Sequence, residues 1–141
     1  MEDFLIQNQK ENDFADWAKL KSKIHFHHDE NKIYFKNREI WWASLGVNIG
    51  KEENGKNGRF ERPVLILNKI NKYTLIIVPL SSKIKQDRFH YQLLVNNRFE
   101  SVLIFQVRTI SSKRLSRKIG CLDKISFQEV KDKINSIFAC N

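Results

Sequence analysis

The chain has 141 residues, about the length of one domain, and 41% of them are hydrophobic, which suffices for one core and excludes a disordered chain. Its longest apolar run is strand-sized and its first residues are acidic, so we expect neither a membrane span nor a signal peptide and predict a cytoplasmic protein. The formal net charge of +9 favours a polyanionic or acidic partner, although a lysine-rich soluble surface explains the charge alone equally well.

The positive charge is unevenly distributed along the chain. Residues 1–38 contain seven Lys or Arg and seven Asp or Glu, whereas residues 39–141 contain eighteen and nine. We therefore divide the sequence into an N-terminal extension, residues 1–38, and a basic domain, residues 39–141. Cys121 and Cys140 have neither metal-ligand spacing nor a disulfide framework, so we expect both to stay reduced and inert.

The first predicted element is an amphipathic helix over residues 13–26, capped by the polar side chain at position 12 or 13. Phe14, Trp17 and Ile24 lie near one face of this helix, and we expect that face to pack on the domain. The segment HFHHDE, residues 25–30, offers possible metal ligands. Consecutive residues rarely converge on one ion, so we predict no metal site and no cofactor.

The segment EIWWASLG, residues 39–46, predicts a strand that ends at Gly46. The loop that follows, residues 46–61, holds four of the five glycines, which let a backbone approach a ligand closely. On the glycines alone, a ligand-binding loop and a plain hairpin connection are equally good interpretations. We expect Arg62 to be the last loop residue, at the rim of a barrel, because Pro63 suits the first residue of a strand.

Five short β-branched or aromatic runs then alternate with brief polar connections, which predicts a small antiparallel barrel. The runs cover residues 63–68, 74–81, 89–95, 101–108 and 117–123. Pro79 lacks a backbone N–H, so we expect it at a bulge or an edge near the end of its strand.

A helix near the C-terminus is the last predicted element. Ser126 and Glu129 have the spacing of a capping box, and Ile125 and Val130 that of a hydrophobic staple. The predicted apolar stripe consists of Phe127, Val130, Ile134, Ile137 and Phe138. The expected fold class is mainly β with α, a small SH3-like antiparallel β-barrel with a C-terminal helix and an N-terminal helical extension.

Three segments, taken in order, resemble the MazF/PemK family of toxin endoribonucleases: EIWWASLGVNIGKEENGKNGRFERPVLIL, VPLSSKIK and SVLIFQVRTISSKRLSRKIGCL. The shared landmarks are the Ile-Trp strand, the glycine-rich loop with a Glu before Arg-Pro-Val, a hydroxyl residue after Pro-Leu, and Gln-x-Arg-Thr followed by Arg-Leu. The resemblance covers residues 39 to about 138. The N-terminal helix looks like the extension of a long-form branch.

The resemblance implies a toxin of a type II toxin-antitoxin system that cleaves single-stranded mRNA at specific sequences without a metal ion. In that reaction the ribose 2′-hydroxyl attacks the adjacent phosphate and leaves a 2′,3′-cyclic phosphate and a 5′-hydroxyl. The resemblance also implies a homodimer and a cognate acidic antitoxin whose largely disordered tail occupies the basic groove.

Three catalytic positions follow from the resemblance. Arg62 matches the family's catalytic arginine, and a guanidinium fork that stays charged suits the stabilisation of phosphate oxygens. Ser81 stands where the family usually has a threonine and keeps the hydroxyl, and its neighbour Ser82 can share or take that role. Glu53 or Glu52 can position Arg62 or accept a proton.

Gln106 and Arg108 match the family motif, and Arg108 is as good a candidate for supporting the site or a dimer as for touching RNA. Phe105 stands where the PemK branch has an aspartate, which disfavours a mechanism through that carboxylate. The other predicted RNA-binding residues are Ser82, Lys83, Lys56, Arg59 and His90, the last of which is as easily explained as a packed strand histidine. The aromatic residues expected nearby, mostly as core residues, are Trp41, Trp42, Phe60 and Tyr91.

Two alternative functions are carried beside this one. A non-catalytic toxin of the same fold, like the gyrase poison CcdB, ends in Trp-Gly-Ile and has no use for the Arg-Pro loop, whereas this chain ends in IFACN. A nucleic-acid-binding barrel without catalysis is the third possibility. An RNA cleavage assay separates it from the first.

Overall fold

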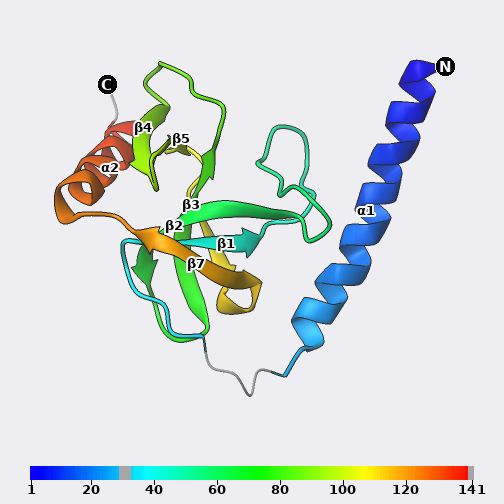
Figure 1. Cartoon of the computed structure of the whole chain (residues 1–141), viewed down its shortest axis with the longest axis horizontal. Helices are drawn as coiled ribbons and strands as arrows, with labels where there is room; N and C mark the ends of the chain where they lie inside the picture. The colour runs from blue at the N-terminus through cyan, green and yellow to red at the C-terminus, as the bar shows by residue number, and fades with distance from the viewer. Residues whose placement is uncertain (29–32, 140–141) are drawn as a thin grey trace.

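The computed structural model describes residues 1–28 and 33–139. Its elements are α1 (Glu2–Phe26), β1 (Glu39–Ser44), β2 (Glu61–Lys69), β3 (Thr74–Ser81), β4 (His90–Val95), β5 (Arg98–Leu103), β6 (Arg108–Ser111), the short 3₁₀ helix η1 (Ser112–Arg114), β7 (Leu115–Cys121) and α2 (Lys124–Ile137). The antiparallel strands curl into a half-barrel with α2 against one side, and α1 stands beside it (Figure 1). The predicted fold class, mainly β with a helix at each end, is confirmed.

Strand β3 joins the two parts of the sheet. The strand order is β4-β5-β3-β2-β1-β7, and β6 also pairs with β3. Residues 74–77 of β3 pair with β6, whereas Leu80 and Ser81 pair with β5. Pro79 lies between these two pairings, near the end of its strand as predicted, at the point where β3 changes neighbours.

The apolar run over residues 101–108 contributes to two strands, so the prediction of a single strand was wrong. β5 ends at Leu103, and a tight turn follows in which the Gln106 N–H donates to the Leu103 carbonyl over 2.9 Å. β6 then begins at Arg108. The chain turns here because β5 and β6 pair with different halves of β3.

The connection between β4 and β5 is tighter than the polar segment predicted. Asn96 and Asn97 have φ angles of 48° and 63°, a conformation that asparagine tolerates and that two-residue hairpin turns require. β5 therefore begins at Arg98, which pairs directly with Val95 of β4.

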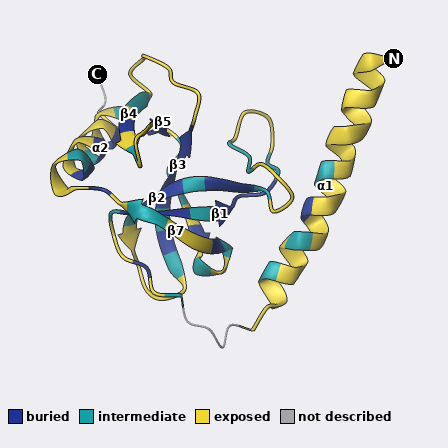
Figure 2. Ribbon diagram, viewed as in Figure 1, coloured by how far each residue is buried: buried dark blue, intermediate teal, exposed yellow. Residues whose placement is uncertain are grey.

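Two clusters of buried side chains form the core. In Figure 2, most of the buried residues, drawn in dark blue, lie on the strands. The first lies between the sheet and α2 and includes Ile40, Leu80 and Phe127. The second lies around Trp41 and includes Phe35, which is 1% exposed although it precedes the first strand. The segment before β1 therefore contributes to the core of the half-barrel.

Helix α2 begins earlier than the capping box predicted. Asp123 is the N-cap, and its Oδ1 accepts a hydrogen bond from the Ser126 N–H over 2.8 Å. Ile125 is 76% exposed, so the predicted staple is wrong as well. Phe127, Val130 and Ile134 of the predicted stripe are buried, Ile137 is partly buried, and Phe138 is exposed. The stripe is therefore confirmed except at Phe138, which follows the end of the helix, and the predicted cap was wrong. Asp and Ser both favour the N-cap position, so the residue types alone do not distinguish them.

Helix α1 is longer than predicted and makes a narrow contact with the half-barrel. It begins at Glu2, so the residues predicted to cap it lie inside it. Its one buried residue is Trp17, whose ring lies edge-on to Phe60 and close against Gly46, while Phe14 is 50% exposed. Neither described helix is long and apolar enough to cross a lipid bilayer.

Candidate active site

The side chain of Arg62 enters a cleft from the second residue of β2, where Arg62 pairs with Ala43 of β1. The expectation that Arg62 ends the loop and Pro63 begins the strand was therefore wrong by two residues. The strand starts early because the loop folds back on itself, and Lys56 and Glu61 exchange backbone hydrogen bonds of 2.8 Å.

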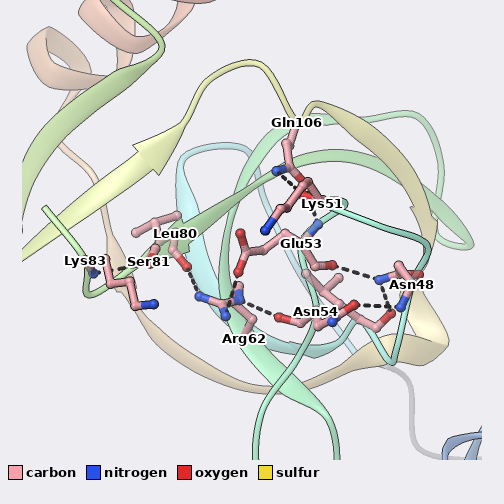
Figure 3. Close-up of polar contacts among 10 residues, drawn as sticks. Asn48, Lys51, Glu53, Asn54, Arg62, Leu80, Ser81, Lys83 and Gln106 are labelled. Atoms are coloured by element: carbon pink, nitrogen blue, oxygen red, sulfur yellow. Dashed lines mark hydrogen bonds and ion pairs between the residues drawn. The ribbon is translucent and has the colours of Figure 1, made fainter. Parts of the chain in front are cut away.

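The guanidinium of Arg62 is held by three different partners (Figure 3). Its Nε donates to the Asn54 carbonyl over 2.6 Å, its Nη1 donates to the Leu80 carbonyl over 3.2 Å, and its Nη2 lies 2.6 Å from the Glu53 carboxylate. The side chain is only 7% exposed. Burial lowers the pKa of Arg62, and the negative charges of Glu53 and Glu100 oppose that effect.

The glycine-rich loop is shaped by hydrogen bonds from its own asparagines. The Asn48 side chain donates to the Glu53 carbonyl over 2.7 Å, and its backbone N–H donates to the Asn54 side chain over 2.6 Å. Position 55 requires glycine, because a Cβ there would lie 1.6 Å from the Phe60 carbonyl oxygen. The loop thus presents a carbonyl and a carboxylate to Arg62, a role for the asparagines that the sequence analysis missed.

Gln106 fastens this loop to the turn after β5. Its Oε1 accepts a hydrogen bond from the Glu53 N–H over 2.7 Å, and its Nε2 donates to the Lys51 carbonyl over 3.4 Å. Gln106 was predicted to bind RNA, and both ends of its amide contact the loop in this structure. The first contact holds the backbone of Glu53, the residue that pairs with Arg62, and the second holds Lys51 two residues earlier.

Ser81 lies at the end of β3, one residue beyond the carbonyl that Arg62 contacts. It is 8% exposed, and its Oγ accepts a hydrogen bond from the Lys83 N–H over 3.2 Å. Ser82 is exposed beside it. The end of β3 therefore brings a hydroxyl next to the strand segment that holds the arginine.

A cleft of about 440 Å³ opens over these groups. It brings together seven of the predicted site residues, namely Arg62, Ser81, Glu53, Lys56, Lys83, His90 and Gln106. It also contains Lys51, Lys85 and Phe105, which the sequence analysis did not place in the site. The cleft is lined by four lysines and Arg62 against one carboxylate, Glu53, and this excess of positive charge favours a phosphate-bearing ligand.

A second hollow of about 420 Å³ shares part of its lining with the cleft, including Phe105, and also contains Arg108 and Glu52. Burial lowers the pKa of Arg108, and the negative charge of Glu52 opposes the shift. The two glutamates therefore face different arginines: Glu53 pairs with Arg62, and Glu52 lies near Arg108. This separates the two candidates that the sequence left open.

Arg59 lies apart from the cleft. Its Nε lies 3.2 Å from the Glu61 carboxylate, and it lines a groove between α1 and the half-barrel. His90 is in the cleft, with its Nδ1 2.6 Å from Asp87 and its side chain 10% exposed. Of the aromatic residues expected nearby, Trp41 is buried in the core.

Within residues 1–28 and 33–139, no group of three His, Cys, Asp or Glu side chains gathers in a way that could hold a metal ion. Cys121 is a free, exposed cysteine. Asp29, Glu30 and Cys140 lie outside the described residues.

Comparison with known protein families gives a match over residues 36–138 to the PemK-like, MazF-like toxins of type II toxin-antitoxin systems. The chain belongs to this family. The resemblance found in the sequence is therefore confirmed, and the match begins at Lys36, directly after Phe35, so α1 lies outside it. A comparison with curated protein sequences found no match.

Solved structures of MazF toxins share the fold. The MazF toxin of Deinococcus radiodurans is 20% identical with a TM-score of 0.62, over 75% of this chain and 98% of that one. The Mycobacterium tuberculosis toxin MazF-mt6 is 20% identical with a TM-score of 0.57, over 74% of this chain and 99% of that one. A MazE-MazF complex from Deinococcus radiodurans matches at 17% identity and a TM-score of 0.57, over 77% of this chain and 100% of that one.

Proposed function

We propose that this PemK/MazF-family toxin is an endoribonuclease that cleaves single-stranded mRNA at specific sequences without a metal ion. The observation that carries the proposal is the placement of Arg62. A guanidinium that is 7% exposed and held from three sides lies in a cleft lined with lysines. Such a fixed positive charge can stabilise a phosphate whose negative charge grows during reaction.

The reaction we propose uses the RNA as its own nucleophile. The ribose 2′-oxygen attacks the adjacent phosphorus, the bond from phosphorus to the 5′-oxygen breaks, and a 2′,3′-cyclic phosphate and a 5′-hydroxyl result. The 2′ proton passes to a base and the leaving oxygen receives a proton. No step requires a metal-activated water, because the attacking oxygen belongs to the substrate.

Arg62 is suited to bind the phosphate oxygens. A guanidinium has five N–H donors, and its three protein contacts use one on each nitrogen. Further N–H groups on Nη1 and Nη2 are then available to clamp a phosphate. The buried contacts fix the direction of this fork before substrate arrives, which reduces the cost of orienting it.

Glu53 is the group we propose as proton acceptor, because its carboxylate lies beside Arg62 and its side chain is 23% exposed toward the cleft. Ser81 contributes a hydroxyl hydrogen bond to a phosphate oxygen. Removing that hydroxyl should lower the cleavage rate less than removing Arg62, because the hydroxyl is a neutral donor. Replacing Ser81 by Thr should preserve activity, because the hydroxyl remains.

Membership of this family supports two protein partners, an antitoxin and a second copy of the chain. Structural relatives include MazE-MazF complexes, and an endoribonuclease solved with its cognate antitoxin from a Mycobacterial species. We propose that an acidic antitoxin binds this chain over the basic cleft and that the toxin acts in the cytoplasm as a homodimer. Size-exclusion chromatography at micromolar concentration tests the dimer, and a monomer there contradicts it.

The decisive experiment uses purified protein, excess EDTA and a matched pair of oligonucleotides. One is single-stranded RNA, and the other carries 2′-deoxyribose at the mapped cut site. We expect the RNA to be cut to a cyclic phosphate and the deoxy analogue to stay intact. Cleavage of the deoxy analogue, or an absolute need for metal, overturns the mechanism, and binding without any cleavage assigns the protein to non-catalytic nucleic-acid binding instead.

A further inference from the structure

A half-exposed aromatic ring, that of Phe105, lies in the cleft. Phe105 lies in the turn between β5 and β6, contributes to both hollows, and is 47% exposed. Exposed phenylalanine is common, but a half-exposed ring among lysines in a concave surface has apolar area that water solvates poorly and a ligand can cover.

The turn that carries Phe105 is fixed on both sides. The Gln106 N–H donates to the Leu103 carbonyl over 2.9 Å, and the Ile104 N–H donates to the Phe89 carbonyl over 3.2 Å. These bonds restrain the backbone on either side of the ring. The position of Phe105 is therefore set before any ligand binds.

Two further rings support that of Phe105. Phe89 lies edge-on to it with ring centroids 6.0 Å apart, and His90 lies edge-on at 5.6 Å. Asp87 anchors both neighbours, because its Oδ1 accepts from the Phe89 N–H over 2.9 Å and lies 2.6 Å from the His90 Nδ1. These T-shaped contacts restrain the ring. Phe105 nevertheless remains 47% exposed, so part of its aromatic surface is accessible to a third partner.

The surroundings favour a ligand that is both anionic and aromatic. Lys51 and Lys83 line the same cleft as Phe105, and the guanidinium of Arg88 lies 4.9 Å from the centre of the Phe89 ring. Lysines pair with phosphates, and an aromatic face pairs with a nucleobase. Single-stranded RNA offers both groups at neighbouring positions, since its bases can leave the stack.

We propose that Phe105, braced by Phe89 and His90, is a stacking platform for one base of single-stranded RNA close to the phosphate that Arg62 binds. The proposal rests on the proposed function for the identity of its ligand. It adds a base-binding subsite to the phosphate site. Binding at this subsite orients the strand across the cleft, and it favours bases with a large stacking area.

The test measures binding of a fluorescent, fully 2′-O-methylated RNA oligonucleotide, which cannot be cleaved, by fluorescence anisotropy at one fixed salt concentration. Phe105→Ala should weaken binding about fivefold to a hundredfold, the range for loss of one stacked base. Phe105→Trp should bind as well as wild type, because it keeps an aromatic face. Phe99→Ala is the matched control: Phe99 is 60% exposed on β5, outside both hollows, and its loss should leave binding unchanged.

A second oligonucleotide with the same backbone but abasic sugars separates stacking from other roles. Its affinity should be the same for wild type and Phe105→Ala. Equal loss on both oligonucleotides, or no loss on the RNA, overturns the platform. A variant that binds RNA normally but no longer binds an acidic antitoxin peptide assigns the ring to protein docking and overturns it too.

The two proposals fail in different ways. Wild-type protein that binds the RNA through Phe105 but cuts no RNA contradicts the proposed function and leaves the platform standing. Wild-type protein that cuts RNA while Phe105→Ala binds as tightly as wild type contradicts only the platform. Thermal unfolding of each variant checks that an exposed substitution has not changed the fold.

Discussion

Two arginine-carboxylate clusters lie on opposite faces of the same strand. Glu61 and Arg62 are neighbours on β2, and successive side chains of a strand point to opposite faces. In the cleft cluster, the Arg62 side chain is 7% exposed and that of Glu53 is 23% exposed. In the outer cluster, the Glu61 side chain is 2% exposed, whereas its partners Arg59 and Arg117 are 58% and 57% exposed.

The member that is buried decides what each cluster can do. A buried arginine keeps a fixed positive charge at the floor of a cleft, poorly screened by water, where an anionic ligand can meet it. A buried carboxylate with exposed arginines presents no such charge. Instead Glu61 joins elements, because it also accepts from the Ser116 hydroxyl of β7 over 3.0 Å. The first arrangement suits chemistry and the second suits stability.

The largest expected effect is the loss of cleavage rate when the buried Arg62 is replaced. Arg62→Ala should lower the cleavage rate about a hundredfold or more, because the transition state loses its main charged donor. Arg62→Lys should also be poor, because an ammonium cannot reproduce a bidentate clamp. Initial rates on a fluorescent RNA substrate measure both.

Arg117→Ala is the matched control for this prediction, since it removes an exposed arginine from the outer cluster. Its cleavage rate should equal that of wild type. If Arg117→Ala loses as much activity as Arg62→Ala while both remain folded by circular dichroism, the contrast between the two clusters fails.

The next effect concerns the carboxylate partner of Arg62. Glu53→Gln should lower the cleavage rate at least about tenfold, because it removes the proposed proton acceptor and weakens the hold on the guanidinium. Glu52→Gln should lower it less, because Glu52 lies near Arg108 instead. Rates measured across pH sharpen the assignment. An acid limb that persists in Glu53→Gln and vanishes in Glu52→Gln would reverse the two roles.

The outer cluster should respond in stability. Glu61→Gln keeps the shape of the side chain but loses charge-assisted hydrogen bonds to Arg59, Arg117 and Ser116, so we expect the free energy of unfolding to fall by about 1 to 3 kcal/mol. Urea denaturation measures that loss. The cleavage rate per folded molecule should not change. A rate loss with unchanged stability would place Glu61 in the chemistry and contradict the comparison.

The sequence predicted the cleft cluster but not the outer cluster, and the difference lies in how far apart along the chain the contacting residues are. The residue types of Arg62 and Ser81 and their spacing identified the cleft through the family resemblance. The outer cluster was not predicted, because Glu61 meets Arg117 across 56 positions of the chain and no local pattern records such a pairing. Arg59 was misplaced for a different reason: its partner Glu61 is only two positions away, and the turn over residues 57–60 carries Arg59 to the face opposite the cleft.

The predicted strand boundaries were wrong where pairing between strands, and not the local sequence pattern, decides where a strand ends. The run 101–108 is continuously apolar apart from its ends and Gln106, and it contains no glycine or proline to mark the turn at Phe105. The run is divided into two strands because β5 and β6 pair with different parts of β3. The exposure of Phe105 follows from that turn, so the proposed stacking ring could not be recognised before the fold was known.

The smallest expected effect on cleavage comes from α1, which lies on the side of the outer cluster. Arg59 and the helix residue Leu20 line the same groove, and Trp17 contacts the half-barrel over Gly46 and Phe60. Trp17→Ala should release the helix, because it removes the one buried side chain of α1. Limited proteolysis should then cut within α1 faster than in wild type, whereas Phe14→Ala, which alters a half-exposed ring, should not change the pattern.

The cleavage rate of Trp17→Ala should match wild type, because the residues that line the cleft come from the glycine-rich loop and the half-barrel and none comes from α1. Deletion of residues 2–28 extends the same test. The deletion ends before Phe35, whose side chain belongs to the core, since removing that ring would destabilise the half-barrel for reasons unrelated to α1. Full loss of cleavage in a deletion variant that still unfolds cooperatively would show that α1 acts on the cleft. The functional difference between the two faces of β2 would then not hold.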